Sequence, residues 1–400
     1  MTKKKIALVT CYFQHNFGSQ LQAYATQMYF DKLNIPNETI CIDGIKKEIN
    51  KAKIKYFLSR CWDINTIKDK FSTVKKIWAL KTGGEALKKN LDLRKEMFNQ
   101  FSKNMFRISQ RCNSINELTD IATNYSAFIV GSDQLWLPSN IEANYYTLNF
   151  VPKDIPKISL ATSFGISKLP KKQAKKAASF LKRLDFCSVR ETSGKEIIKR
   201  LINKDVPVVC DPTILFTATE WNSITKPERF YKEPYLFCYF LGNNPQQRKF
   251  VKRFKEKTGY KIIQLQHCDE YIKSDVDFPD YAPYNVGPSE FIQLIRDAEY
   301  VFTDSFHCSV FSMLYAKNFF TFRRYHSDNI VSTNGRLYSL LSIASLKDRL
   351  LTGSESVEDC LIKEINYNNV HEKLRKFRDF TKEYIENALN QIGIKYDTNR

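Results

Sequence analysis

The chain has 400 residues, 43% of them hydrophobic, which suits two globular domains of ordinary size with a core in each. Its formal net charge of +19 favours anionic partners, such as phosphates, nucleic acid or an anionic membrane surface. The lysines are spread along the chain without a zinc-finger or RNA-binding signature, so nucleic acid is not predicted as a partner.

Cysteine usage indicates a reducing compartment. Ten cysteines are present, but no two form a Cys-x-x-Cys pair. Several, including Cys11, Cys210 and Cys238, stand in apolar, strand-like runs, where cysteine behaves as a small buried hydrophobe. The sequence therefore predicts neither a zinc site nor a disulfide framework, and it calls for no cofactor. We expect a cytoplasmic protein, and no apolar run approaches the length of a membrane span.

The first predicted unit is a strand over Ile6–Phe13, followed by a helix from Gln20 to about Leu33. The loop between them is polar and contains Gly18. In open α/β sheets ligands bind at such loops, although ordinary turn chemistry is the alternative. The loop lacks the Gly-x-Gly-x-x-Gly pattern, so a dinucleotide is not predicted. A second strand is expected at Thr39–Ile42.

Residues 46–110 are rich in lysine and have a helical pattern. On one side of this pattern stand the apolar residues Ile54, Phe57, Leu58 and Trp62. A basic amphipathic helix can lie on a membrane surface. The interpretation we favour is a domain helix with a solvated outer face.

Two predicted strands in the middle of the chain end in polar residues. The strand Ala127–Val130 is followed by Gly131, Ser132 and Asp133, and Asp133 is a candidate acid, base or hydroxyl binder. Trp136 offers a surface on which a sugar could stack, or it is a core residue. A further strand is expected over Lys157–Gly165.

Arg190 closes a short predicted strand that begins at Phe186, and a helix is expected from Ser193 to about Leu201. An arginine in this position can hold phosphate or carboxylate with two hydrogen bonds, and a salt bridge with Glu191 or another acid is the alternative. The next apolar run, Val206–Thr213, is predicted as one more strand. The domain boundary is placed near residues 211–227.

The second half of the chain repeats the alternation of strands and helices. A helix capped by Ser289 is expected before the central stretch. Another helix opens at Asn334 and carries Arg336 near its start. The remaining predicted elements are strands at Tyr235–Leu241, Ile262–Gln266 and Asn318–Phe322, a helix at Gln246–Thr258, and C-terminal helices from about Tyr367.

The functional prediction depends on the stretch Tyr300–Tyr315. Its first residues predict the end of a buried strand, helical spacing begins at Val310, and Thr303–Ser305 favours a turn and a helix N-cap. His307 stands in this turn, where a helix N-terminus offers N–H groups to an anion and where imidazole can transfer protons near neutral pH. A packed histidine without a catalytic role is the alternative.

Several of these motifs, taken in order, resemble the polysaccharide pyruvyl transferase family over about residues 6–350. They are Asn16–Tyr24, Gly131–Trp136, Ser188–Glu191, Asp211–Thr213, Thr303–Cys308, and Arg336–Leu341 with Asp348-Arg349. The sequence departs from the family at Cys308, where glycine is common. Glycine allows a backbone to approach a ligand closely. The cysteine at this position therefore affects how well the substrate that donates the transferred group would fit.

The resemblance implies two Rossmann-like α/β domains that face a cleft, as in the GT-B fold of glycosyltransferases. We expect an N-terminal α/β domain on the acceptor side over 1–215, a C-terminal α/β domain on the donor side over 216–365, and helices of 366–400 packing across both. The implied reaction transfers a pyruvyl group from phosphoenolpyruvate to a sugar of a cell-surface polysaccharide or of its lipid-linked precursor, and forms a ketal on two hydroxyls.

Phosphoenolpyruvate carries a phosphate and a carboxylate, so its site needs cations and free N–H donors. Arg190 and Arg336 are the candidate cations. Ser305 and Ser309 mark the turn that would supply N–H groups.

Ketal formation requires a proton on the enol carbon, and His307 is the candidate acid and base. Asp304 or Asp133 is expected to orient it or to deprotonate a sugar hydroxyl. The candidates for acceptor binding are Asn16, Gln20, Gln22, Ser132 and Trp136.

Two other functions remain open. A glycosyltransferase that uses a nucleotide sugar would have the same architecture, and its diphosphate would suit a basic site at a helix terminus. A carbohydrate-binding family member without activity is the non-enzymatic alternative. Peripheral contact of the basic 46–110 region with the inner membrane face would suit a lipid-linked acceptor.

Overall fold

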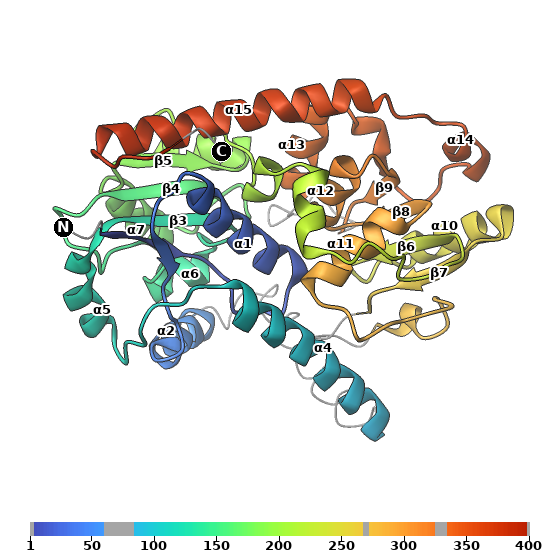
Figure 1. Cartoon of the computed structure of the whole chain (residues 1–400), viewed down its shortest axis with the longest axis horizontal. Helices are drawn as coiled ribbons and strands as arrows, with labels where there is room; N and C mark the ends of the chain where they lie inside the picture. Colours follow the sequence, from blue (N-terminus) through green and yellow to red (C-terminus); the bar gives the residue numbers. More distant parts are fainter. Residues whose placement is uncertain (1–3, 60–83, 267–271, 325–333, 398–400) are drawn as a thin grey trace.

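The computed structural model describes residues 4–59, 84–266, 272–324 and 334–397. Two parallel β-sheets with helices on their faces lie side by side, and the long helix α15 runs along both (Figure 1). The fold is therefore α/β with two parallel-sheet units, as the alternation of strands and helices predicted.

The first sheet has the strand order β2-β1-β3-β4-β5, and all of its strands are parallel. Its strands are β1 (Lys5–Val9), β2 (Asn37–Thr39), β3 (Tyr125–Asp133), β4 (Lys157–Thr162) and β5 (Phe186–Val189). The surrounding helices are α1 (Phe17–Lys32), α2 (Lys46–Leu58), α4 (Gly84–Met105), α5 (Ile115–Ile121), η1 (Ala122–Asn124), α6 (Pro138–Ala143), α7 (Lys171–Leu181) and α8 (Thr192–Ile202).

A connection with short helical turns leads to the second sheet. It contains η2 (Pro212–Leu215), α9 (Ala218–Trp221) and η3 (Asn222–Ile224). The second sheet has the order β10-β9-β8-β6-β7 and is also parallel. Its strands are β6 (Tyr235–Tyr239), β7 (Lys261–Gln264), β8 (Tyr300–Thr303), β9 (Asn318–Phe322) and β10 (Leu350–Leu351). Its helices are α10 (Pro245–Thr258), η4 (Lys273–Asp275), α11 (Pro288–Asp297), α12 (Phe306–Leu314), α13 (Asn334–Ala344), η5 (Lys347–Arg349) and α14 (Val357–Leu361), followed by α15 (Tyr367–Gln391).

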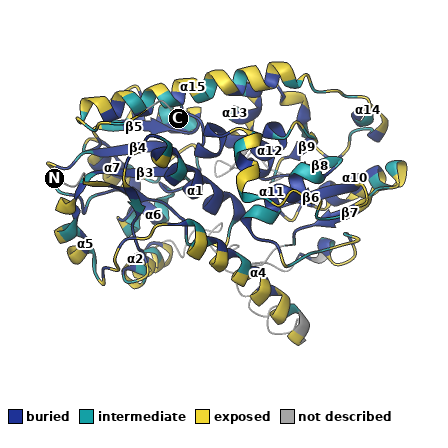
Figure 2. Cartoon of the chain, in the orientation of Figure 1, coloured by how far each residue is buried: buried dark blue, intermediate teal, exposed yellow. Residues whose placement is uncertain are grey.

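The central strands form as buried strands because they are apolar on both faces. Ile6, Ala7, Leu8 and Val9 of β1 are fully buried, and the strands of both sheets lie in the buried interior (Figure 2). Helices cover both faces of a parallel sheet, so its strands carry continuous apolar runs rather than an alternating pattern. Gly131 lets β3 and β4 approach, since a Cβ there would lie 2.5 Å from the carbonyl oxygen of Leu160.

Helix α15 joins the two units through hydrogen bonds. The hydroxyl of Thr381 accepts from the backbone N–H of Cys210 (2.9 Å), and the hydroxyl of Tyr384 donates to the carbonyl of Ser159 (2.9 Å). Nearer its start, Nε2 of His371 lies 2.9 Å from the carbonyl oxygen of Met313 in α12. These contacts bind one helix to both halves of the molecule.

Some predicted elements are wrong in extent or in kind. The expected strand Val206–Thr213 has only one bridge, between Val208 and Val189, because the prolines at 207 and 212 lack the N–H groups that a ladder needs. The predicted first strand ends early, at Val9. Ser289 does not cap α11; Gly287 is the N-cap, and its N–H donates to the carboxylate of Glu290 (3.0 Å).

Three of the four apolar residues expected on one side of the 46–110 pattern lie in α2 and do not pack inward. In α2 the buried residues are Ile49 and Tyr56, whereas Ile54, Phe57 and Leu58 are exposed. Trp62 lies outside the described residues. Among the residues that the structure describes, no helix combines the length and the apolarity needed to cross a bilayer.

Candidate active site

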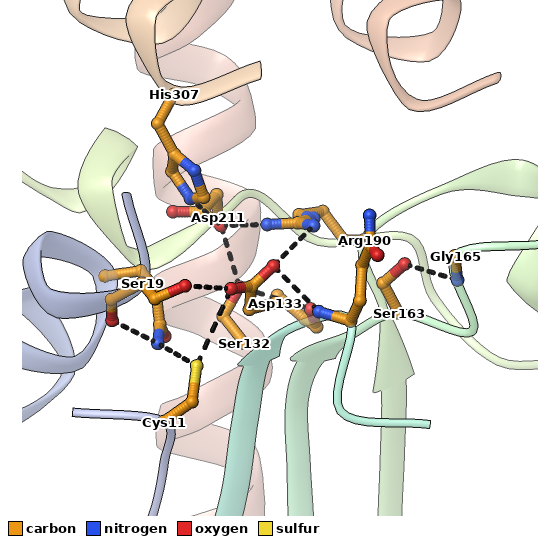
Figure 3. A network of polar contacts seen from close by, with 12 residues as sticks. Cys11, Ser19, Ser132, Asp133, Ser163, Gly165, Arg190, Asp211 and His307 are labelled. Atoms are coloured by element: carbon orange, nitrogen blue, oxygen red, sulfur yellow. Dashed lines mark hydrogen bonds and ion pairs between the residues drawn. The ribbon is translucent and has the colours of Figure 1, made fainter. Parts of the chain in front are cut away.

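The carboxyl ends of strands from both sheets carry the polar residues of the candidate site. In the first unit, Cys11 follows β1, Asp133 ends β3, Ser163 follows β4 and Arg190 follows β5. In the second unit, Asp304 and Ser305 follow β8, and His307 lies in the first turn of α12. Contacts between the two sets show that these two edges meet, as ligand-binding edges of open α/β sheets do (Figure 3).

His307 is held between the two halves. Ser305 is the N-cap of α12, and its hydroxyl accepts from the N–H of Cys308 (3.4 Å), which fixes the turn. Nε2 of His307 lies 3.4 Å from Oδ2 of Asp211, a residue of the connection between the sheets. On the other edge of the ring, a Cβ added to Gly18 would lie only 2.0 Å from Nδ1. The position of the imidazole ring therefore requires glycine at position 18, since any side chain there would clash with it.

Asp211 is the centre of the polar network (Figure 3). Its Oδ2 accepts from the hydroxyl of Ser132 (2.7 Å) and from Nη1 of Arg190 (2.6 Å), and its Oδ1 accepts from the N–H and the hydroxyl of Thr213. Burial alone would raise the pKa of Asp211, but the charge and close approach of His307, the charge of Arg190 and the bonds from Thr213 hold it far below its ordinary value. Asp211 is therefore an ionised carboxylate beside His307.

Arg190 forms the salt bridge that was one of the two interpretations of its position. Its guanidinium is buried and bridges two carboxylates, with Nη1 2.6 Å from Asp211 and Nη2 3.6 Å from Asp133. It also lies over the ring of Phe306, 4.4 Å from the centroid. The salt-bridge partners are thus these two aspartates rather than Glu191. Within the described residues, Nε and Nη2 of Arg190 make no hydrogen bond.

Asp133 has a strained backbone and a well-supported side chain. Its φ is +69°, in the left-handed region that few non-glycine residues adopt, and such strain is found at functional sites. Its Oδ2 accepts from the hydroxyl of Ser19 (2.6 Å) and lies 3.6 Å from the thiol of Cys11. Burial opposes ionisation, yet the charges of Arg190 and His307 and the bond from Ser19 lower the pKa of Asp133.

Arg336 reaches the same site from α13. Its guanidinium is buried and lies against the side-chain amide of Gln134, the residue after Asp133, and it donates to the amide oxygen when that oxygen is turned toward it. Burial and the like charges of Arg190 and Arg324 lower the pKa of Arg336, and Asp133 and Glu191 offset this only in part. Among the described residues, the carboxylates near Arg336 do not fully offset burial and the neighbouring cations, and an anionic ligand would add to that compensation.

Asp304, Ser305 and Ser309 have backbone hydrogen-bond partners in the structure. The carboxylate of Asp304 accepts from the backbone N–H groups of Leu241 (2.6 Å) and Gly242 (2.8 Å), so it fixes the loop after β6, and Asp211 is the carboxylate beside His307. Ser305 serves as the cap described above. The hydroxyl of Ser309 donates to the carbonyl of Ser305 (3.0 Å) inside α12.

The expected acceptor residues have mostly structural contacts. The side chain of Asn16 caps α1 by accepting from the N–H of Ser19 (3.0 Å). Gln20 and Gln22 are buried; the amide of Gln20 donates to Ser102 (2.9 Å) and that of Gln22 to the carbonyl of Ser19 (2.8 Å). Ser132 is also buried and is bonded to Asp211 as described.

Trp136 is a core residue. Its side chain is fully buried, its Nε1 donates to the carbonyl of Tyr146 (3.1 Å), and its ring packs against Phe164 and Phe180. The indole is not available for a sugar to stack on, so the stacking expectation is corrected.

Asp211 is the residue of the candidate site that sequence reasoning missed, although its motif was identified. The available signal was an aspartate directly before Pro212 and two residues before Thr213, a pattern that fixes an ionised carboxylate at the start of a helical turn. The described cysteines are free and buried, and Cys61 and Cys268 lie outside the described residues. In the part of the chain that the structure describes, no three His, Cys, Asp or Glu side chains form a metal-binding group.

Comparison with solved structures identifies the fold. A crystal structure of a UDP-N-acetylglucosamine 2-epimerase superposes with a TM-score of 0.53 at 10% sequence identity, covering 98% of this chain and 97% of that chain. A Listeria monocytogenes protein, solved as a putative UDP-N-acetylglucosamine 2-epimerase, gives a TM-score of 0.52 at 10% identity, covering 100% and 99%. At this identity the likeness concerns the fold alone, and that fold is GT-B.

Comparison with curated protein sequences gives no match. The family model of polysaccharide pyruvyl transferase matches residues 16–327, a range that includes Gly18, Asp133, Arg190, Asp211 and His307. Because the match covers well over half of the chain and agrees with the motif order, the chain belongs to the polysaccharide pyruvyl transferase family.

Proposed function

We propose that the protein transfers a pyruvyl group from phosphoenolpyruvate to two hydroxyls of a saccharide, in a cell-surface polysaccharide or its lipid-linked precursor. The observation that carries the proposal is the buried pair of His307 and Asp211, set beside the guanidinium groups of Arg190 and Arg336. This arrangement combines an acid/base group with cations for an anionic donor. Family membership supports the same reaction class.

Donor binding rests on Arg336 and on the helix termini. Arg190 is largely balanced by Asp133 and Asp211, so its share in binding the phosphate or carboxylate comes mainly from Nε, which makes no hydrogen bond to any described residue. Arg336 has the weaker compensation and is the stronger candidate for the donor's charge. The first turns of α1 and α12 flank His307 at Gly18 and Ser305, and helix N-termini favour anions.

His307 is proposed to move the protons of the reaction. It gives a proton to C3 of phosphoenolpyruvate, which makes C2 electrophilic. The first saccharide hydroxyl adds to C2, and the second hydroxyl replaces phosphate at C2. Of the two hydroxyl protons, one restores the proton that His307 gave to C3 and the other leaves with phosphate, so the products are the cyclic ketal and inorganic phosphate. Asp211 is a positioning residue that orients the ring and balances its charge when it is protonated.

The acceptor is proposed to approach from the N-terminal unit, residues 1–215, and the donor from the C-terminal unit, residues 216–365. Asp133 is the candidate to accept a proton from a hydroxyl of the saccharide, because it is held as a carboxylate by Arg190 and Ser19. Asn16, the last residue before α1, is partly exposed. Among the residues expected to bind the acceptor, it is the candidate that a sugar could reach.

The test is transfer from phosphoenolpyruvate to a saccharide panel, followed as phosphate release and as ketal formation. His307→Ala should lower turnover about 10²–10⁴-fold, the usual contribution of general acid–base catalysis, without lowering thermal stability much. His371→Ala is the matched control, because this histidine lies on α15 and contacts Met313. Full turnover by His307→Ala would exclude the proposed role.

A second candidate, transfer from a nucleotide sugar, is favoured by the GT-B fold. Ligand-induced stabilisation separates the two functions, because a ligand that binds the folded state raises Tm by mass action. Stabilisation by phosphoenolpyruvate that is lost in Arg336→Gln supports pyruvyl transfer. Stabilisation by a nucleotide sugar alone would favour the glycosyltransferase, and stabilisation by a saccharide alone a carbohydrate-binding protein.

A further inference from the structure

The outward face of helix α2 combines lysines with exposed apolar side chains. The helix, Lys46–Leu58, contains five lysines and one glutamate. Lys47, Lys51, Ile54 and Leu58 follow one another at spacings of four, three and four residues, so they form a single stripe along a helix of 3.6 residues per turn. We call these four residues the outer stripe.

The apolar side chains of the outer stripe do not pack into the hydrophobic core. The opposite face of α2 buries Ile49 and Tyr56, whereas Ile54 is 58% exposed and Leu58 is 60% exposed. A surface helix ordinarily places its apolar residues inward. Single exposed apolar residues are common, but here two stand one turn apart at the end of a basic stripe. Helices that lie in a membrane interface have this combination.

We propose that the outer stripe docks on an anionic lipid surface. The ammonium groups of Lys47 and Lys51 pair with headgroup phosphates, and their alkyl stems lie along the apolar boundary. Ile54 and Leu58 enter that boundary from the same side of the helix. The helix has four more cationic than anionic side chains, in a chain with a net charge of +19, so the surface that binds it should be negatively charged.

The position of α2 links this surface to the candidate active site. The ammonium of Lys46 lies 5.2 Å from the centroid of the Phe13 ring and pairs with Asp43 (3.0 Å). Phe13 lies in the loop between β1 and α1, residues 10–16, and Gly18 follows this loop in the first turn of α1, against His307. Docking through α2 would therefore bring this loop close to the bilayer, where a lipid-linked saccharide is carried. This last step rests on the proposed function, but lipid binding itself does not.

Sedimentation with vesicles tests the proposal on the full-length protein. Binding should be strong to vesicles of phosphatidylcholine with 30% phosphatidylglycerol, about tenfold or more weaker to phosphatidylcholine alone, and weaker as salt increases. Ile54→Asp/Leu58→Asp should lose binding at least tenfold. Ile362→Asp/Phe380→Asp is the matched control, since both side chains are exposed and belong to the region of α14 and α15, on the other side of the molecule from α2 (Figure 1). Its binding should not change.

Charge reversal gives an independent test. Lys47→Glu/Lys51→Glu should lose binding, while Lys249→Glu/Lys252→Glu on α10, with the same change in net charge, should retain it. Equal loss in both variants would overturn the proposal, because net charge alone would then explain binding.

The proposal would also be overturned if Ile54→Asp/Leu58→Asp dissociated a dimer in the absence of lipid. Phosphate release with a water-soluble acceptor should be unaffected by the outer-stripe variants, so failure of the proposed reaction is detected separately.

Discussion

The imidazole of His307 and the backbone of Gly18 are in such close contact that a single methyl group at position 18 would lie 2.0 Å from Nδ1. The two residues come from different units, since Gly18 lies in α1 and His307 in α12. The ring is therefore positioned by the first unit as much as by its own helix. On its other edge, Asp211 completes the arrangement.

Gly18→Ala should displace the imidazole and lower turnover strongly, at a cost in stability of about 1–3 kcal/mol from overpacking. Steady-state kinetics and chemical denaturation measure the two effects. The double variant Gly18→Ala/His307→Ala provides the control, because without the ring the added methyl group has no clash and the destabilisation should largely disappear. Equal destabilisation in both backgrounds would contradict the contact.

Asp211→Asn should destabilise the protein by about 3–5 kcal/mol, because it leaves Arg190 with a single buried counter-charge. It should also lower kcat more than it raises KM, since in the proposed mechanism Asp211 orients the ring rather than binding substrate. Lys195→Ala removes a pairing with Asp205 at the surface and should change stability by less than about 1 kcal/mol. A loss of stability no larger than in this control would argue against the central role of Asp211.

Asp211 also predicts an acid-dependent stability. Its pKa in the folded state is far below the value of about 3.9 expected in the unfolded chain. The unfolded chain therefore binds the proton more readily, so the stabilisation is complete above about pH 4 and is lost as pH falls below that value. Asp211→Asn should flatten this part of the curve of unfolding free energy against pH. An unchanged slope would show that other carboxylates dominate.

Arg336→Gln should weaken the binding of phosphoenolpyruvate about 10–150-fold, the equivalent of one charge-assisted hydrogen bond of about 1.5–3 kcal/mol. Calorimetry or ligand-induced stabilisation measures the change. Arg253→Gln removes the same charge from α10, where the guanidinium donates to the carbonyl of Gly353, and should leave the affinity unchanged. Equal loss in both variants would indicate a general effect of net charge.

Thr381→Val should lower the free energy of unfolding by about 1–3 kcal/mol, because the buried N–H of Cys210 loses its acceptor. Asn387→Ala, at an exposed position of α15, should change it by less than about 0.5 kcal/mol. Urea denaturation of both variants compares them directly. A neutral Thr381→Val would show that α15 does not depend on this bond.

The sequence by itself determined most of the fold. Continuous apolar runs such as Tyr300–Thr303 and Tyr235–Tyr239 form strands because both faces of a parallel sheet are covered. The turn at Ser305 and the helix after it were likewise readable, because an N-cap is a local interaction. Local patterns also placed His307, Asp133 and Arg190 at the carboxyl ends of strands. They could not show which way a side chain points, so Trp136 was open to both a core and a surface interpretation until its burial was known.

Only the tertiary structure decided which of these residues meet. Nothing local to Asp304 or Asp211 reveals which carboxylate lies beside His307; they are 3 and 96 residues away along the chain, and the distant one makes the contact. Asp304 is instead held by the N–H groups of Leu241 and Gly242, a pairing set by the adjacency of β6 and β8. The candidate site forms where the carboxyl edges of the two sheets meet, and each sheet is built from a different part of the sequence. The distances between residues of the two edges depend on how the sheets pack together, which the periodicity of the sequence does not encode.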